Sequence, residues 1–437
     1  MMILGVKEKP TIGKWFALSF QHLFAMFGAT VLVPMLTGLP ISVALFTSGV
    51  GTLIYILCTQ AKVPVYLGSS FAYIGVILEL SKYNPETNTP GYYGTVLTSL
   101  FVVGLVYVLI AILIKLLGTK WINKVLPPII IGPMIIIIGL SLAGTAISSA
   151  GLSGGSWKEI LVAAVAFGIV AFISLKCKGF LKIIPFLIGI AGGYVFAAII
   201  GLVDFSEFVQ VVKTPSEWVK IPEFMFLGFK DSTTTFLGSK ITFYKINFAA
   251  VLTVAPLALV TASEHIGDHA VISKIVGQDF LQDPGLHRTL LGDGIATSFA
   301  ALVGGPANTT YGENTSVVGM TKVASVWVTG GAAVMAIILS FINVFVTLID
   351  SIPQAVMGGI SIILYGFIAA NGLRVMADAK VKFSNTKNLI LISTMLVIGL
   401  GGAILKFGTI SLSGMSLAAI LGIILNFILP DSKDEQE

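Results

Sequence analysis

Apolar runs of about 20 residues recur along almost the whole chain, and they constrain its fold more than any other feature. A helix that spans a bilayer needs about 20 mostly apolar residues. Only 11% of the residues are charged, against about 25% in soluble domains. The sequence therefore predicts a polytopic membrane protein. The twelve clear candidate spans are 15–36, 40–60, 94–117, 123–147, 158–175, 180–203, 246–270, 288–304, 327–349, 354–375, 387–404 and 411–430.

Two further segments are interrupted rather than continuously apolar. The segment 63–80 opens Val-Pro-Val-Tyr-Leu-Gly-Ser-Ser, and the segment 306–325 opens Pro-Ala-Asn-Thr-Thr-Tyr-Gly. Each begins with an extended, β-branched or polar piece and then becomes helix-like. Counted as crossings that are half strand and half helix, they bring the predicted total to fourteen.

The distribution of basic residues gives an orientation. With fourteen crossings and a cytoplasmic N-terminus, 18 of the 26 Lys and Arg residues fall on the cytoplasmic side. Five of the other 8 lie in one long loop, 204–245. Because basic residues accumulate in cytoplasmic loops, both termini are predicted to be cytoplasmic. The net charge of +5 has the same origin and is no sign of nucleic-acid binding.

A weak internal repeat relates the two halves at an offset of about 240 residues. Residues 68–72 (Gly-Ser-Ser-Phe-Ala) resemble residues 308–312 (Asn-Thr-Thr-Tyr-Gly), and residues 126–132 resemble residues 352–358. Seven crossings per copy is an odd number, so the copies are expected to lie in opposite orientations. Paired interrupted segments in corresponding halves indicate a secondary-transporter site at the repeat interface.

Three carboxylates stand where an apolar chain can least accommodate them. Glu264 and Asp268 are one helical turn apart and share a face. Two such groups are not expected to be charged together in a poorly hydrated setting, so one should hold a proton near neutral pH. Glu313 begins the helical half of the second interrupted segment, where the helix dipole favours an acid. A structural interpretation stays open for each: a solvated Asp268, a backbone-bonded Glu264 and an N-terminal capping role for Glu313.

Other residues near these acids can contribute to recognition. The backbone at Gly312 and at Phe71 can offer an N–H group, and the Phe71 ring can stack on a flat ligand. Gln21 and His22 can take part or can simply hydrogen-bond between helices. Asp293 is a candidate for supporting the site, with a lone structural acid as the alternative.

One motif points to a different class of protein. Residues 265–269 read His-x-x-Asp-His, close to the inverted zinc-protease pattern His-x-x-Glu-His. However, Asp replaces Glu, a glycine interrupts the helix, and no third ligand is evident. We therefore expect no metal, and a membrane metalloprotease is kept only as a remote alternative. No Gly-x-x-x-x-Gly-Lys-Ser/Thr stretch supports an ATP-driven pump. Cys58 and Cys177 are expected to be separate thiols.

Several motifs occur together in one order. The chain resembles the nucleobase–ascorbate transporter family (nucleobase–cation symporter 2), most closely its bacterial, uracil-transporting members. The motifs that carry the resemblance are 19–34 (Ser-Phe-Gln-His-Leu-Phe-Ala-Met-Phe-Gly-Ala-Thr-Val-Leu-Val-Pro), 66–72 (Tyr-Leu-Gly-Ser-Ser-Phe-Ala), 264–267 (Glu-His-Ile-Gly), 283–288 (Asp-Pro-Gly-Leu-His-Arg) and 308–314 (Asn-Thr-Thr-Tyr-Gly-Glu-Asn).

The resemblance implies an all-α membrane fold of 14 segments in two inverted seven-segment repeats. Segments 3 and 10 would be broken, with short antiparallel strands that meet at the site. A core domain would move against a gate domain, and the gates would form a homodimer. The implied parts are core 1–118 and 246–350, gate 119–204 and 351–430, an extracellular loop 205–245 and a cytoplasmic tail 431–437.

The resemblance also implies a function: symport of uracil with protons across the bacterial cytoplasmic (inner) membrane. No cofactor, metal or nucleic acid is implied, and the only other partner is membrane lipid. Another nucleobase such as xanthine is the alternative substrate. The implied residues are Glu264, Glu313, Phe71, Gly312 and Tyr311 for the base, Glu264 and Asp268 for the proton, and Gln21, His22, Ser70, Asp293 and Asn314 around them.

Two departures from the family pattern affect these expectations. Some uracil-transporting members carry His one turn after the helix glutamate, where this chain has Asp268 and moves the histidine to His269. Ser316 replaces a glycine of the family signature that Glu313 and Asn314 begin. We expect Glu313→Gln to lose ligand binding and His269→Ala to be mild.

Overall fold

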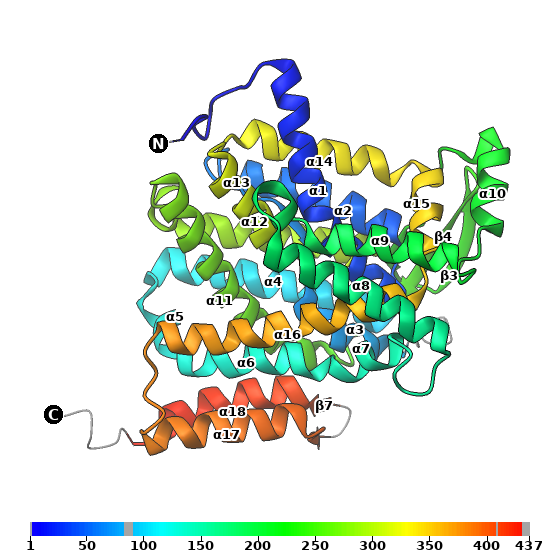
Figure 1. The fold of residues 1–437 in the computed structure, drawn as a ribbon. Helices are drawn as coiled ribbons and strands as arrows, with labels where there is room; N and C mark the ends of the chain where they lie inside the picture. Colours follow the sequence, from blue (N-terminus) through cyan, green and yellow to red (C-terminus); the bar gives the residue numbers. More distant parts are fainter. Residues whose placement is uncertain (1, 83–90, 408–409, 431–437) are drawn as a thin grey trace.

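The computed structural model describes residues 2–82, 91–407 and 410–430. It is a bundle of helices with three small sheets (Figure 1). Within the described residues, six helical stretches are long and apolar enough to cross a membrane. They are α1 (Ile12–Thr37), α2 (Ile41–Cys58), α4 (Gly94–Leu117), α6 with α7 (Pro128–Ser141 and Ala143–Ser149), α8 (Trp157–Lys176) and α16 (Gln354–Asp378).

Most of the other helices are shorter or carry polar residues. Helix α11 holds Glu264 and Asp268, and α12 holds Asp293. The remaining bounds are η1 and α3 (Phe71–Tyr73 and Ile74–Ser81), α5 (Lys120–Val125), η2 (Gly179–Lys182), α9 (Pro185–Ile199), α11 (Val251–Val276), η4 (Leu281–Gly285), α12 (Leu286–Val303), α13 (Gly312–Thr321), α14 (Val326–Ser340), α15 (Asn343–Asp350), α17 (Thr386–Leu400) and α18 (Gly414–Ile428).

The helices pack in two groups. Helices α1, α2 and α4 contact α11, α12 and α14, whereas α6, α7, α8 and α9 contact α16, and α17 packs on α6 and α18. Glycines allow the closest approaches, as expected for helices in lipid. A Cβ added at Gly104 of α4 would lie 2.5 Å from the Gly294 carbonyl oxygen of α12. A Cβ at Gly372 of α16 would lie 2.5 Å from the Gly132 oxygen of α6, so each group has its own glycine contact.

The two interrupted segments meet at a short antiparallel sheet, as the sequence predicts. Strand β1 (Leu67–Ser69) pairs with β5 (Asn308–Thr310) in the register Leu67↔Thr310, and both strands are wholly buried. The Ser70 N–H donates to the Ala307 oxygen at 2.8 Å, and the Tyr311 N–H donates to the Tyr66 oxygen at 3.0 Å. Backbone groups at membrane depth must be satisfied within the protein, and here two half-crossings satisfy each other.

Buried side chains complete the bonding of these two strands. The Thr52 hydroxyl accepts from the Leu67 N–H at 2.9 Å, and the Asn308 amide donates to the Thr47 oxygen at 3.1 Å. The Thr297 hydroxyl donates to the Asn308 oxygen at 3.0 Å. Helices α2 and α12 are therefore both hydrogen-bonded to the sheet. These bonds fix the positions of the two strands, and so the points at which η1 with α3 and α13 begin.

Two further sheets were not predicted from the sequence. The loop between α9 and α11 contains helical turns and a three-stranded sheet in the order β2-β4-β3, and a hairpin joins α17 to α18. Residue Val219 of the loop pairs with Ile342 at the break between α14 and α15. The bounds are α10 (Ser206–Lys213), η3 (Pro215–Glu217), β2 (Met225–Gly228), β3 (Ser232–Phe236), β4 (Ser239–Lys245), β6 (Ile404–Phe407) and β7 (Ile410–Ser413).

The two ends of the helix bundle are clearly different. The N-terminal segment lies beside α13, and α10, β3 and β4 lie at the opposite end (Figure 1). The N-terminal contact is a short backbone pairing, in which the Ile3 N–H donates to the Lys322 oxygen at 2.7 Å and the Ala324 N–H donates to the Leu4 oxygen at 2.9 Å. We refer to these ends as the N-terminal side and the loop side.

Candidate functional site

Helix α11 presents two carboxylates at the end of strand β5. The Glu264 side chain is exposed although Ser263 and His265 on either side are buried, and Asp268 is partly exposed. The Thr310 hydroxyl of β5 donates to Asp268 Oδ2 at 2.5 Å. An exposed acid within a buried stretch marks space that solvent or a ligand can occupy. Asp268 is therefore bonded to the sheet, whereas Glu264 has no described partner of this kind.

The second interrupted segment brings a third carboxylate to the same place. Glu313 is partly exposed in the first turn of α13, and its charge and that of Asp268 are close enough to Glu264 to interact with it. Gly312 is exposed, and an added Cβ there would meet nothing within 4 Å. The open space beside Gly312 and the three acids are the features that a small polar ligand requires.

The two aromatic residues next to the strands are oriented differently. Phe71 is partly exposed at the start of η1. Tyr311 is buried, its hydroxyl donates to the Ser69 oxygen at 3.0 Å, and it accepts from the Thr30 hydroxyl at 3.1 Å. Its ring packs against Gly68, where an added Cβ would lie 2.4 Å from the ring. Of the two rings, only that of Phe71 has exposed surface for a ligand.

The predicted supporting residues differ in whether their side chains are hydrogen-bonded. The Asn314 amide donates to His22 Nδ1 at 3.1 Å and to the His22 oxygen at 2.9 Å, so α13 is joined to α1. Gln21 Oε1 and Ser70 Oγ are buried and have no hydrogen-bond partner among the described residues. Ser316, which replaces the family glycine, is exposed, so this substitution costs no close packing.

Asp293 bonds to a histidine and not directly to Glu264. Its Oδ2 lies 2.9 Å from His265 Nδ1, and both side chains are fully buried. His269 is also fully buried, with Nε2 in contact with the Tyr55 hydroxyl. The described residues contain no group of His, Cys, Asp and Glu arranged to hold a metal. The burial of His269 also changes the expectation that His269→Ala is mild, because that substitution would leave the Tyr55 hydroxyl without a partner.

On α11 and α13, exposed positions continue from the acids toward the N-terminal side. On α11 the exposed positions Gly267 and Val271 follow Glu264, and on α13 Ser316 and Met320 follow Gly312 at intervals of one turn. Both helices run toward the N-terminal side. On the loop side, by contrast, every residue of α1 from 25 to 37 is buried.

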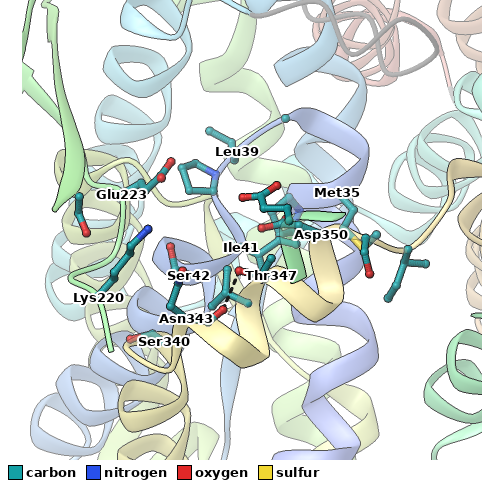
Figure 2. Close-up of a pocket in the computed structure, with 18 of the residues that line it drawn as sticks. Met35, Leu39, Ile41, Ser42, Lys220, Glu223, Ser340, Asn343, Thr347 and Asp350 are labelled. Atoms are coloured by element: carbon teal, nitrogen blue, oxygen red, sulfur yellow. Dashed lines mark hydrogen bonds between the residues drawn. The ribbon is translucent and has the colours of Figure 1, made fainter. Parts of the chain in front are cut away.

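A polar cavity of about 750 Å³ lies on the loop side, and no predicted site residue lines it. Figure 2 shows Ser42 of α2 and Thr347 and Asp350 of α15 around the same space as Lys220 and Glu223 of the long loop. This cavity lies at the outer ends of the helices and is separate from the acids of α11 and α13. We do not count it as part of the candidate site.

Sequence reasoning missed three residues that contact α11. Thr310 bonds Asp268, the Tyr73 hydroxyl lies 2.9 Å from Thr261 Oγ1 of α11, and Tyr55 contacts His269. Thr310 stands inside the motif 308–314, so its hydroxyl was visible as part of a pattern. Tyr55 and Tyr73 are single polar groups in apolar helices and give no sequence signal of their own.

Comparisons with known proteins identify the family. A family model described as the Permease family matches residues 13–407. The uracil permease of Bacillus subtilis (strain 168) is 46% identical over 442 residues, covering 99% of this chain and 96% of the relative. The uracil permease of Bacillus caldolyticus is 46% identical, covering 98% and 95%, and that of Escherichia coli (strain K12) is 39% identical, covering 97% and 93%.

Solved structures share the fold at low sequence identity. The transmembrane domain of a cyanobacterium bicarbonate transporter, BicA, aligns with a TM-score of 0.61 at 14% identity, covering 95% of this chain and 97% of that one. Murine Slc26a9, described as an anion transporter in the inward-facing state, aligns with a TM-score of 0.67 at 11% identity, covering 97% and 69%. The chain shares this fold. Its family and its apolar helices make it a multi-pass membrane transporter and no enzyme. It belongs to the Permease family, the nucleobase–ascorbate transporter family that its motifs indicate, and is similar to bacterial uracil permeases.

Proposed function

We propose that this chain imports uracil together with protons and that Glu264, Glu313 and Gly312 bind the base. The observation that carries the proposal is the open space beside Gly312, with carboxylates from two helices at its border. Relatives named uracil permeases, at 39–46% identity over nearly the full length, supply the substrate.

The chemistry of uracil suits these groups. The ring carries two N–H donors and two carbonyl acceptors around its edge. A carboxylate can accept from a ring N–H, whereas a protonated carboxyl or a backbone N–H can donate to a carbonyl. Glu264 and Glu313 would bind the polar edge, the Gly312 N–H would donate, and Phe71 would cover a face of the ring. Tyr311 would contribute through its backbone, since its side chain is bonded to Thr30 and Ser69.

Proton coupling follows from the number of acids. Glu264, Asp268 and Glu313 cannot all be charged within one poorly hydrated site, so at least one of them binds a proton before uracil does. Glu264 is the acid that touches the base, and Asp268, with its hydrogen bond from Thr310, shares the proton with it. No cofactor is required, because the proton gradient supplies the driving force.

The arrangement behind this site would be two inverted repeats of seven segments. Two observations support it: β1 and β5 are antiparallel, and the helices pack in two groups. The group with α1–α4 and α11–α14 would be the core domain, residues 1–118 and 246–350. The group with α6–α9 and α16–α18 would be the gate, residues 119–204 and 351–430, through which two copies would associate.

Transport would proceed by alternating access. The core would move against the gate around a fixed site, which is the usual mode of transporters built from inverted repeats. With both termini in the cytoplasm of a bacterium, the N-terminal side is the inner side. On that orientation, the exposed positions that follow Glu264 and Gly312 would support an inward-open conformation.

Uptake of labelled uracil into proteoliposomes tests the proposal. A gradient that is acidic outside should accelerate uptake, and a protonophore should remove the acceleration. Uptake that is indifferent to the gradient would refute symport. Unlabelled xanthine should compete poorly, and strong competition by xanthine would make that base the substrate. Sulfate and dicarboxylates should not compete, because an anion is opposed by the carboxylates of the site.

A further inference from the structure

The two histidines of α11 have no role in the site as described so far, although they directly follow its acids. His265 follows Glu264, and His269 follows Asp268. Both imidazoles are fully buried, and their rings are stacked with centroids 4.0 Å apart and planes 26° from parallel. On a helix, consecutive side chains point about 100° apart. The acids and the histidines therefore occupy two adjacent faces of α11.

The hydrogen bonds of His269 define its tautomer and its donor. His269 Nδ1 lies 2.7 Å from the His265 backbone oxygen, which can only accept, so Nδ1 carries the proton. In the neutral ring Nε2 is then an acceptor. The Tyr55 hydroxyl of α2 contacts this nitrogen and donates to it. Because Tyr55 is fully buried, water does not compete for this bond.

His265 makes the matching contact one turn earlier. Its Nδ1 lies 2.9 Å from Asp293 Oδ2 of α12, and both side chains are fully buried. Asp293 Oδ1 and His265 Nε2 have no hydrogen-bond partner among the described residues. Helix α11 is thus joined to α2 and to α12 by two side-chain contacts one turn apart. Two such contacts fix both the rotation of α11 about its axis and its position along that axis.

The groups around this cluster are few and come from every helix packed on it. Tyr73 and Tyr107 lie near Asp293, and Cys58 lies near Tyr55. The charged or titratable groups that face the cluster are Tyr55 and Cys58 of α2, Tyr73 of η1, Tyr107 of α4, Glu264 and Asp268 of α11, Asp293 of α12 and Glu313 of α13. Arg288 of α12 is a cation at its border, since its Nη1 donates to the Cys58 backbone oxygen at 3.3 Å.

We propose that Tyr55 and Asp293 are positioning residues, which act through His269 and His265 to set the directions of Asp268 and Glu264. The inference rests on the proposed function, because it concerns the acids that bind uracil and the proton. Tyr55 and Asp293 themselves do not touch the ligand. Loss of either contact allows α11 to rotate, which moves both acids relative to Gly312 and Glu313. In this proposal, Asp268 of the His-x-x-Asp-His pattern belongs to the site, and His265 and His269 hold the helix in place. The pattern is then no metal motif.

The test compares Tyr55→Phe with a matched control in purified full-length protein. Tyr55→Phe keeps the ring and removes only the donor to His269. Tyr365→Phe removes a hydroxyl that is also buried but lies on α16, in the other group of helices. Uracil binding is measured by calorimetry from pH 5 to 8, and the midpoint of thermal unfolding is measured without ligand. Asp293→Asn, which keeps the shape and an acceptor oxygen, is the second variant.

The expected result for Tyr55→Phe is a Kd raised about fivefold, as for the loss of one hydrogen bond, with a shifted pH dependence of binding. Tyr365→Phe should leave both unchanged. Asp293→Asn should also shift the pH dependence of binding, and its shift should differ from that of Tyr55→Phe, because it alters the contact with His265 rather than that with His269. If Tyr55→Phe and Asp293→Asn lower only the unfolding midpoint and leave Kd and its pH dependence unchanged, the two residues are structural and the inference is wrong. If the unmodified protein binds no uracil at any pH, the proposed function is wrong, and this result is distinct from a failure of the positioning inference.

Discussion

The two strand-and-helix segments that meet at the site share a backbone plan and differ in chemistry. Both strands are buried and pair with each other, and both helices end at a lysine in the left-handed conformation, Lys82 with φ 56° and Lys322 with φ 58°. The first segment continues into the apolar η1 and α3, whereas the second begins α13 with Gly312 and Glu313. One segment offers an aromatic surface, and the other offers a carboxylate and open space.

The same contrast holds for the residues just before the two helices. Ser70 and Thr310 are equivalent in the repeat, yet Ser70 Oγ has no described partner and Thr310 donates to Asp268. Phe71 and Tyr311 are equivalent too, yet Phe71 is partly exposed and Tyr311 is bonded inward. The comparison teaches that two segments with one backbone plan can differ in the groups they expose, so in the proposed site each would take a different share of ligand binding. Substitutions at equivalent positions should therefore have unequal effects.

The largest difference is expected between the acids of the two helices. Glu313→Gln should weaken uracil binding about 100-fold, because a hydrogen bond to a charged group contributes about 1.5–3 kcal/mol. Glu79→Gln changes an exposed carboxylate of α3 that is none of the proposed ligand groups, so it is the control and should leave the Kd for uracil unchanged. Equilibrium binding of labelled uracil measures both. Equal losses in the two variants would mean that charge in general matters and that α13 has no special role.

The two glycines should separate folding from binding. At Gly312 an added Cβ meets nothing within 4 Å, whereas at Gly68 it would lie 2.4 Å from the Tyr311 ring. Gly312→Ala should leave thermal stability unchanged and raise the Kd for uracil about 20-fold, as the methyl group fills ligand space. Gly68→Ala should lower the unfolding midpoint. A normal Kd in Gly312→Ala would show that the open space belongs to no ligand.

The sequence predicted the frame of the fold because its signals are local. Apolar length marked the helices, and the extended pieces 63–70 and 306–311 marked the strands that pair as β1 and β5. The strand pair β6–β7 and the sheet of the long loop were missed, since strands of four to seven residues between helices have no apolar length to reveal them. The inverted repeat and the domain division remain proposals.

The sequence indicated the acids but not their partners. Glu264, Asp268 and Glu313 stand out because carboxylates are rare in apolar helices. The contacts around them come from distant positions: Thr310 bonds Asp268 from 42 residues away, Asp293 contacts His265 from 28, and Tyr55 contacts His269 from 214. Packing decides which face of α11 meets α2, so the burial of both histidines could only be seen in the structure. The same is true of the Tyr311 side chain, which points into the protein.

The equivalent hydroxyls should differ by a smaller factor. Thr310→Val keeps the shape of the side chain and removes the donor to Asp268, which should slow gradient-driven uptake about fivefold and shift its pH dependence. Ser70→Ala removes a hydroxyl without a described partner and should do neither. Initial rates at several external pH values provide the measurement. If Thr310→Val shows a normal pH profile, Asp268 has no part in coupling, and Glu264 must carry the proton alone.

The smallest effect is expected at the equivalent aromatic rings, and it tests the division of roles most directly. Phe71→Leu keeps an apolar side chain but loses the flat ring, so uracil binding should weaken about threefold with unfolding unchanged. Tyr311→Phe keeps the ring and loses the bonds to Ser69 and Thr30, so it should lower the unfolding midpoint and leave the Kd unchanged. The reverse pattern would mean that Tyr311 faces the ligand during transport, and that the inward turn of its side chain belongs to only one conformation of the cycle.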